Sequence, residues 1–299
     1  MCVGITVLDV VQRVAQRPRW GVKSVATSVE IAAGGPAANA AVTAARLLGS
    51  AHLITALGQS PQADLVRADL SRHGVEVIDC APTGWSMPVS TCIVEDAGER
   101  TVVAVGATDS PVELTDPARA LVRQASGILV DGHHPHAALE ALELRGEECI
   151  AVLDAGSAKP HVKGWLPLID VAAGSADYAA GLGLDLAGAL AHVLTAGAGA
   201  GVMTDGANPL CWAQGGLGQP GLGGAGEPGR QPTWLTPPSV TAVDTLGAGD
   251  AFHGGLLAAL VAGLPLEAAV GLAAQVASTR VAQVGARGWL SALNPMVSG

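Results

Sequence analysis

The segment from Asp244 to Asp250 reads Asp-Thr-Leu-Gly-Ala-Gly-Asp and leads directly into a run of small apolar residues. Glycines at 247 and 249 allow a tight turn and a close approach of the backbone to a ligand. A helix that begins at this turn offers unpaired N–H groups and the positive end of its dipole to an anion. Asp250 is then either a helix N-cap or a base beside an anion site, and the second reading suits phosphoryl transfer to a hydroxyl.

The composition favours an enzyme-sized folded domain and argues against nucleic acid or an anionic membrane as the main partner. Of 299 residues, 49% are hydrophobic and 14% are charged, with a formal net charge of −10. The five cysteines are scattered and form no C-x-x-C pair, which fits a reducing compartment. With no basic-apolar leader and no apolar run of about 18 residues, we expect a cytoplasmic protein without a membrane span.

Apolar runs alternate with helical patterns along most of the chain. We expect strands at residues 1–11, 52–57, 75–78, 128–131, 150–154, 170–173 and 201–204, and helices at 40–48, 63–73, 135–144, 186–194 and 266–284. This order predicts an α/β fold with a mostly parallel sheet covered on both faces. Asp9 is expected near the C-terminal edge of the first strand, where open α/β sheets bind ligands.

Two segments interrupt this alternation. The β-branched runs at 89–94 and 100–105 flank a polar turn and predict a hairpin in a separate small sheet, to which residues 20–33 add short strands. Residues 214–232 are rich in glycine and proline and predict a flexible surface loop.

The motifs Gly34-Gly35-x-x-x-Asn39 and Asp244-Thr-x-Gly-Ala-Gly-Asp250, the second followed by Ala-Phe-x-Gly, resemble those of the PfkB carbohydrate kinases, the ribokinase-like enzymes. The resemblance runs almost from end to end. It implies one three-layer α/β/α domain over residues 1–299, with a small β lid from about 12–33 and 85–107 that closes over the sugar. The segments at 3–7 and 34–38 are most similar to the ketohexokinase and sulfofructose kinase branch.

The resemblance also assigns roles at the acceptor side. It implies that Asp250 is the base and that the amides of Gly247, Ala248 and Gly249 form an anion hole. An aspartate with an ordinary pKa of about 4 is ionised at neutral pH. The residues that resemble sugar ligands or lie where the pocket is expected are Asp9, Gly34, Gly35, Asn39, Arg100 and His133.

Three of the polar acceptor-side residues also have a structural reading. Asn39 is a sugar ligand or a buried helix cap. Arg100 faces the pocket or pairs across the hairpin. His133 faces the acceptor or is an exposed residue at a helix start.

The donor is expected to be ATP, over the C-terminal edge of the sheet near Thr204, Gly206, Gly249, Ala274 and Ala277. Mg²⁺ is expected to bind mainly through the nucleotide phosphates and water. The N-x-x-E element typical of the family is absent, and Asp177 is its candidate substitute. Many family members also hold K⁺, for which Asp244 and the carbonyls of Leu246 and Gly285 are the candidate ligands.

The resemblance leaves the acceptor and the assembly open. Few basic residues are available for an anionic acceptor, which favours a neutral sugar. A nucleoside kinase of the same fold is an alternative, although it needs aromatic stacking surfaces and only Trp20 and Trp85 are near the expected lid. A non-catalytic sugar or nucleotide sensor is a third reading, against which the intact Gly-Ala-Gly-Asp segment argues. Because the lids of family members often pair with each other, the resemblance implies a homodimer.

Overall fold

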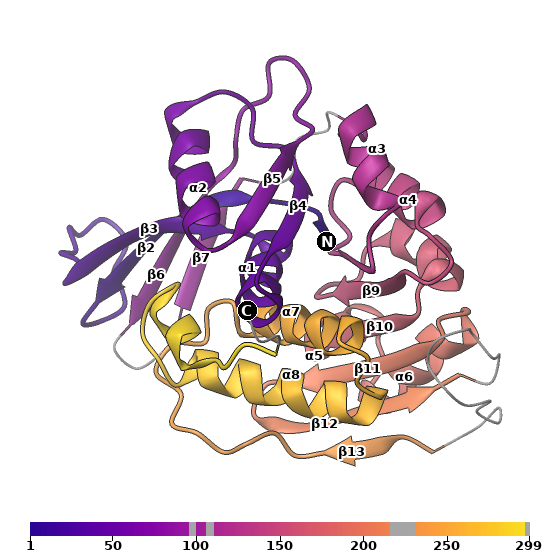
Figure 1. Ribbon diagram of the computed structural model, residues 1–299. Helices are drawn as coiled ribbons and strands as arrows, with labels where there is room; N and C mark the ends of the chain where they lie inside the picture. Colours follow the sequence, from indigo (N-terminus) through magenta and orange to yellow (C-terminus); the bar gives the residue numbers. More distant parts are fainter. Residues whose placement is uncertain (96–99, 106–110, 216–230, 297–299) are drawn as a thin grey trace.

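A computed structural model describes residues 1–95, 100–105, 111–215 and 231–296 and contains two separate β-sheets (Figure 1). The large sheet has nine strands in the order β13-β12-β11-β10-β9-β8-β1-β4-β5. The strands from β11 to β5 are parallel, whereas β12 and β13 add an antiparallel edge. The bounds are β1 (Cys2–Val3), β4 (Ala51–Thr55), β5 (Val75–Asp79), β8 (Gly127–Val130), β9 (Ile150–Ala155), β10 (Val171–Ser175), β11 (Ala200–Asp205), β12 (Asn208–Gln214) and β13 (Thr233–Leu235).

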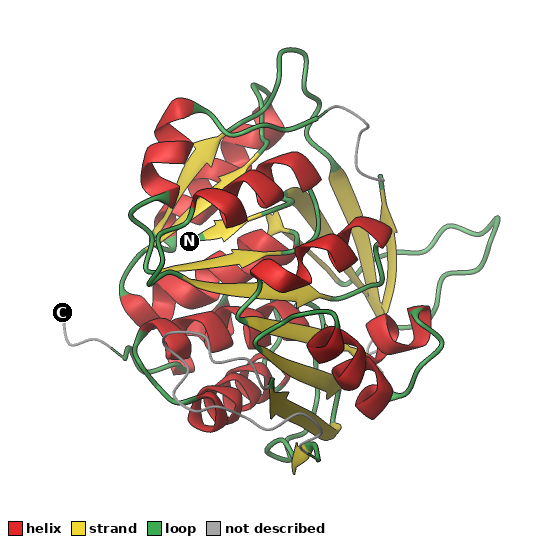
Figure 2. Ribbon diagram, turned by 90° about the vertical axis from the view of Figure 1, so that its right-hand side faces the viewer, coloured by secondary structure: helices red, strands yellow, loops and turns green. Residues whose placement is uncertain are grey.

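Helices cover both faces of this sheet (Figures 1 and 2). Alternate strand residues point to opposite faces, so neighbouring residues such as Leu53 and Ile54 enter two different hydrophobic cores. One core is shared by α1 (Pro36–Leu48), α2 (Pro61–Arg72), α7 (Ala248–Val261), α8 (Leu266–Val281) and the short 3₁₀ helix η2 (Gly288–Ala292). The other is shared by α3 (Asp116–Val122), α4 (Pro135–Leu144), the 3₁₀ helix η1 (Pro160–Leu168), α5 (Ala176–Gly181) and α6 (Leu186–Thr195). The predicted fold class is confirmed.

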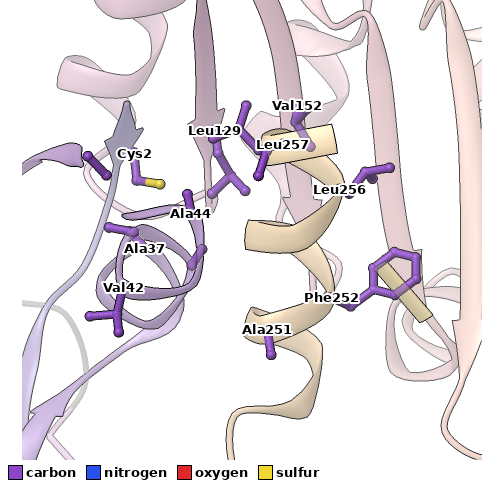
Figure 3. Packing of buried hydrophobic residues seen from close by; sticks show 14 of the residues in the cluster. Cys2, Ala37, Val42, Ala44, Leu129, Val152, Ala251, Phe252, Leu256 and Leu257 are labelled. Atoms are coloured by element: carbon purple, nitrogen blue, oxygen red, sulfur yellow. The ribbon is translucent and has the colours of Figure 1, made fainter. Parts of the chain in front are cut away.

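Helices α1 and α7 pack closely against each other and against the central strands (Figure 3). Gly254 makes this approach possible, because a Cβ at that position would lie 2.4 Å from the carbonyl oxygen of Ala40. Figure 3 shows Leu256 and Leu257 of α7 beside Leu129 and Val152 of the sheet. The two helices carry the two motifs, so their contact brings the motifs together.

The small sheet stands apart from the large one and has the strand order β3-β2-β6-β7 (Figure 1). Its strands are β2 (Val7–Val14), β3 (Ser28–Gly34), β6 (Val89–Glu95) and β7 (Arg100–Ala104). The predicted hairpin is the antiparallel pair of β6 and β7. Its turn at 96–99, residues 106–107 of the expected lid and most of the expected loop at 214–232 lie outside the described residues.

The prediction of a single strand over residues 1–11 is wrong. The chain leaves the large sheet after Val3 and enters the small sheet at Val7, so Asp9 lies within β2 rather than at the edge of the large sheet. The break follows from Asp131, whose buried carboxylate accepts the N–H of Ile5 at 2.9 Å in place of a ladder partner. Gly4 is needed there, because a Cβ would lie 2.2 Å from the same carboxylate.

The remaining predicted elements agree with the structure to within a few residues. Helices α3 and α5, the 3₁₀ helix η1 and strands β12 and β13 were not predicted. No helix among the described residues is long and apolar enough to cross a membrane.

Candidate active site

The two motifs meet where the N-terminal turns of α1 and α7 face the small sheet. Asp250 lies in the first turn of α7, and its Oδ2 accepts a hydrogen bond from Nδ2 of Asn39 on α1 at 2.7 Å. The contact joins residues 211 positions apart in the sequence. Asn39 is therefore a direct partner of the candidate base rather than a helix cap.

The turn before α7 requires glycine at its N-cap. Gly247 has a left-handed backbone with φ of 71°, and a Cβ there would lie 3.5 Å from Nδ2 of Asn39 and 3.6 Å from Oδ2 of Asp250. Within the described residues, the N–H groups of Gly247 and Gly249 make no hydrogen bond, and that of Ala248 makes a long one of 3.4 Å. The start of α7 thus presents N–H donors beside a carboxylate, as an anion site requires.

The protonation of Asp250 differs from the ordinary aspartate expected from the sequence. Burial, with the nearby Asp154 carboxylate, raises the pKa of Asp250 to about 6, although the hydrogen bond from Asn39 opposes the shift. One turn further along α7, His253 is 4% exposed and its Nδ1 lies 3.1 Å from Oδ2 of Asp154. Burial disfavours a charged imidazole, but Asp154 and Asp250 outweigh it and raise the pKa of His253.

Asp9 is the second carboxylate of the site, and it lies against the glycine pair. Burial raises the pKa of Asp9 to about 6, opposed by a hydrogen bond with Ser90 and by the charge of Arg287. A Cβ on Gly34 would lie 2.0 Å from Oδ2 of Asp9, and one on Gly35, which has φ of 96°, would lie 2.6 Å from the carbonyl of Ile5. Both glycines are therefore required for the strand and the helix to approach each other.

Arg287 was not predicted, yet it ties the acceptor side together. Its side chain is 12% exposed and donates to the carbonyl of Ala33 at 2.6 Å, to Oδ1 of Asn39 at 3.1 Å and to Oδ2 of Asp69 at 3.2 Å. Because the guanidinium occupies Oδ1 of Asn39, the amide turns its Nδ2 toward Asp250. No local pattern could have identified Arg287, since its partner Asn39 is 248 positions away.

A cavity partly open to solvent lies among these groups. Of the predicted site residues it is lined by Asp9, Asn39, Leu246 and Gly247. Its other lining residues are Val11, Ala33, Thr43, Arg280, Ala286, Arg287 and Trp289.

Two predicted acceptor-side residues contact neighbouring structure instead of lining this cavity. Arg100 donates from Nη1 to Oγ1 of Thr245 at 2.6 Å, immediately before the glycine turn. His133 is half-buried and donates its backbone N–H to Oδ1 of Asp131 at 2.8 Å.

The predicted donor-side residues lie at the C-terminal ends of β10 and β11 and on α8. Thr204 pairs in register with Ser175, and exposed Asp177 follows in the first turn of α5. Gly206 makes the turn after β11 with φ of 54°. On α8, Ala274 is buried in the core and Ala277 is partly buried. Among the described residues, no three His, Cys, Asp or Glu side chains come together as a metal site.

The expected monovalent-cation ligands have other partners. Leu246 and Gly285 donate their backbone N–H groups to the Asp244 carboxylate, each at 3.1 Å. The Asp244 carboxylate also pairs with Arg13 and Arg280.

Comparison with known proteins gives a consistent result. Residues 1–292 match the model of the pfkB family carbohydrate kinases. A structure from Agrobacterium tumefaciens, provisionally assigned as a ribokinase, is 27% identical with a TM-score of 0.81, covering 95% of this chain and 91% of that chain. The ribokinase of Thermotoga maritima is 20% identical with a TM-score of 0.80 and coverage of 99% and 95%. The ribokinase of Arabidopsis thaliana, complexed with ribose and ATP, is 20% identical with a TM-score of 0.76 and the same coverage.

Proposed function

Because the chain belongs to the pfkB family of carbohydrate kinases, which transfer a phosphoryl group to a sugar hydroxyl, we propose that Asp250 is the base that accepts the proton of the attacking hydroxyl. The observation that carries the proposal is the position of its carboxylate, held by Asn39 at the start of α7 beside unpaired N–H groups. A pKa of about 6 keeps Asp250 ionised at neutral pH and brings it close to the operating pH, where a general base is most effective.

We assign the anion hole to the amides of Gly247, Ala248 and Gly249. The transferred phosphoryl group is charge-rich in its transition state, so positioned N–H donors stabilise it more than they stabilise the ground state. The open space around Gly249, where a Cβ would meet nothing within 4 Å, supports an approach of the phosphate to this turn.

The acceptor is proposed to bind between Asp9, Asn39 and the Gly34-Gly35 backbone, with the small sheet as its lid. On β2, Asp9 alternates with Val10, so the carboxylate faces the cavity while Val10 faces away. Arg100 lies on the edge strand β7 of the same sheet and connects the proposed lid to the loop before the glycine turn through its hydrogen bond to Thr245.

A neutral sugar fits this pocket better than an anionic one. The arginines beside the cavity are already paired: Arg13 and Arg280 with Asp244, and Arg287 with Asp69. A nucleoside is disfavoured, because neither Trp20 nor Trp85 lines the cavity. Trp289 does line it, but it is only 3% exposed and offers little ring surface for stacking. The sequence similarity to ketohexokinases makes ketoses the first sugars to test.

We propose that ATP binds along the C-terminal ends of β10 and β11, reached by Thr204, Gly206 and Gly249, with the Ala274–Ala277 turn of α8 as the adjoining wall. Mg²⁺ would be held chiefly by the nucleotide phosphates and water, with Asp177 as the nearest protein carboxylate at that edge. When bound, the ion neutralises phosphate charge.

The outer face of the small sheet supports a homodimer formed through the lid. Ile31, Val10, Thr91 and Val103 lie in one row across the four strands. Val29, Ile31 and Val103 are 64%, 54% and 65% exposed, although they are apolar. Sedimentation should give a dimer that Val103→Glu dissociates, whereas Val284→Glu, at an exposed valine after α8, should leave it intact. A monomeric unmodified protein would refute the dimer.

An ADP-release screen over ketoses, aldoses, acidic sugars and nucleosides, with Mg²⁺ present, tests the function. We expect turnover with a neutral sugar. In Asp250→Asn, sugar binding should persist by calorimetry while turnover falls by about 10²–10⁴-fold. Asp185→Asn, at an exposed N-cap where asparagine caps equally well, is the control. Turnover near that of the unmodified protein in Asp250→Asn would refute the role of Asp250.

A further inference from the structure

The loop that leads to the glycine turn is held by a buried carboxylate surrounded by donors. Asp244 is 2% exposed, and its Oδ1 accepts the N–H of Leu246 at 3.1 Å while its Oδ2 accepts the N–H of Gly285 at 3.1 Å. Nη2 of Arg280 lies 3.4 Å from Oδ1, and Nη2 of Arg13 pairs with Oδ2. Every oxygen that a cation could use at Asp244 therefore already faces positively polarised N–H groups.

A monovalent cation does not fit this arrangement. A K⁺ ion needs several free oxygen ligands, but both carboxylate oxygens of Asp244 already accept a backbone N–H group and face an arginine. An ion held by the Asp244 carboxylate would also lie close to the guanidinium of Arg280 and be repelled by its positive charge. Arg280 cannot easily move aside, because it is 3% exposed and donates to the carbonyls of Asp244 at 3.4 Å and Gln283 at 3.1 Å.

The guanidinium of Arg280 lies near the loop that leads to the glycine turn. Arg280 lines the same cavity as Leu246 and Gly247, the residues that lead into the proposed anion hole. Arg13 approaches Asp244 from the small sheet, so Asp244 also connects the proposed lid to this loop.

We infer that Arg280 takes the place of a monovalent cation beside the anion hole, and that the enzyme neither binds nor requires K⁺. Arg280 is a positioning residue: it fixes the loop from Asp244 to Gly247 and supplies a permanent positive charge next to it. This inference rests on the proposed kinase function only for its kinetic consequences. The expected absence of K⁺ binding depends only on the geometry around Asp244.

The first experiment compares K⁺, Na⁺ and N-methyl-D-glucammonium at equal ionic strength. Without substrates, we expect the same melting temperature in all three salts to within about 1 °C, because a ligand raises the melting temperature only when it binds the folded state. With the best sugar and ATP, kcat should agree within about two-fold. A K⁺-specific rise of the melting temperature, or a K⁺ activation above about ten-fold, would overturn the inference. If no sugar is phosphorylated, the proposed function fails while the melting comparison still tests K⁺ binding.

The second experiment removes the guanidinium. Arg280→Met should lower kcat at least ten-fold at saturating substrates, and Arg280→Lys should restore most of it, because lysine returns the charge. Arg123→Met, at an exposed arginine ending α3, is the matched control and should leave kcat unchanged. A kcat within two-fold of the unmodified enzyme in Arg280→Met, or no rescue by lysine, would contradict the role of Arg280. Should Arg280→Met not fold, the salt comparison remains decisive.

Discussion

Replacing Asp250 by asparagine should stabilise the folded protein while abolishing its activity. The site raises the pKa of Asp250 from its ordinary 3.8 to about 6. At 1.36 kcal/mol per pKa unit, the difference corresponds to roughly 3 kcal/mol of unfolding free energy lost when Asp250 ionises. Asparagine keeps an oxygen for the Asn39 hydrogen bond and cannot ionise, so it avoids this cost.

The direction in which the unfolding free energy changes with pH follows from proton binding. Between pH of about 4 and 6 the folded protein holds a proton on Asp250 that the unfolded chain has released, so the unfolding free energy falls as the pH rises through this window. The gain from Asp250→Asn should therefore be largest above pH 6 and vanish below about pH 4.

Thermal melts at pH 7.5 and pH 4 measure both effects. For a chain of this length, 1 kcal/mol shifts the melting temperature by roughly 1.5–2 °C, so the difference of roughly 3 kcal/mol predicts a rise of about 4–6 °C at pH 7.5. Asp185→Asn, at its exposed N-cap, should change little. A lower melting temperature for Asp250→Asn at pH 7.5, or an equal gain at both pH values, would refute the reasoning.

Three further predictions concern the acceptor side. Gly34→Ala places a Cβ 2.0 Å from Oδ2 of Asp9 and should raise the KM for the sugar more than ten-fold, whereas Gly271→Ala, on α8 with open space around it, should not. Arg287→Met should lower kcat/KM for the sugar about 10–100-fold by freeing the Asn39 amide, with partial rescue in Arg287→Lys; an unchanged value would show that the amide is held without it. The kcat/KM profile should fall with decreasing pH below about 6 as Asp250 takes up a proton, and a profile flat down to pH 5 would exclude it as the base.

Much of the fold was predictable because its signals are local. Apolar runs of strand length separated by helical patterns identify the parallel sheet, and the glycine turn before α7 points to the proposed anion site from a few neighbouring residues. The pairing of Asn39 with Asp250 could be expected only from the joint presence of both motifs. The structure adds the contact itself, with Nδ2 of Asn39 lying 2.7 Å from Oδ2 of Asp250.

The errors arise where a distant residue decides a local conformation. Residues 1–11 read as one strand, since no turn signal other than Gly4 interrupts them, but Asp131 captures the N–H of Ile5 from 126 positions away. Arg280 and Arg287 could not be assigned for the same reason. A lone arginine forms no recognisable sequence motif. Its role depends on which carboxylate or amide the fold places beside it.

The short passage from β1 to β2 also limits how this region can vary. Asp9 and Arg13 reach the interior because they share one face of a strand whose faces alternate at every residue. A single residue inserted or deleted within β2, between Val7 and Asp9, that shifts the register of the strand would turn both side chains outward and bring Val10 and Gln12 inward. Substitutions at Val10 or Gln12 change only the outer surface. Active homologues should therefore differ here by substitution or by paired insertions, and not by an odd change in length.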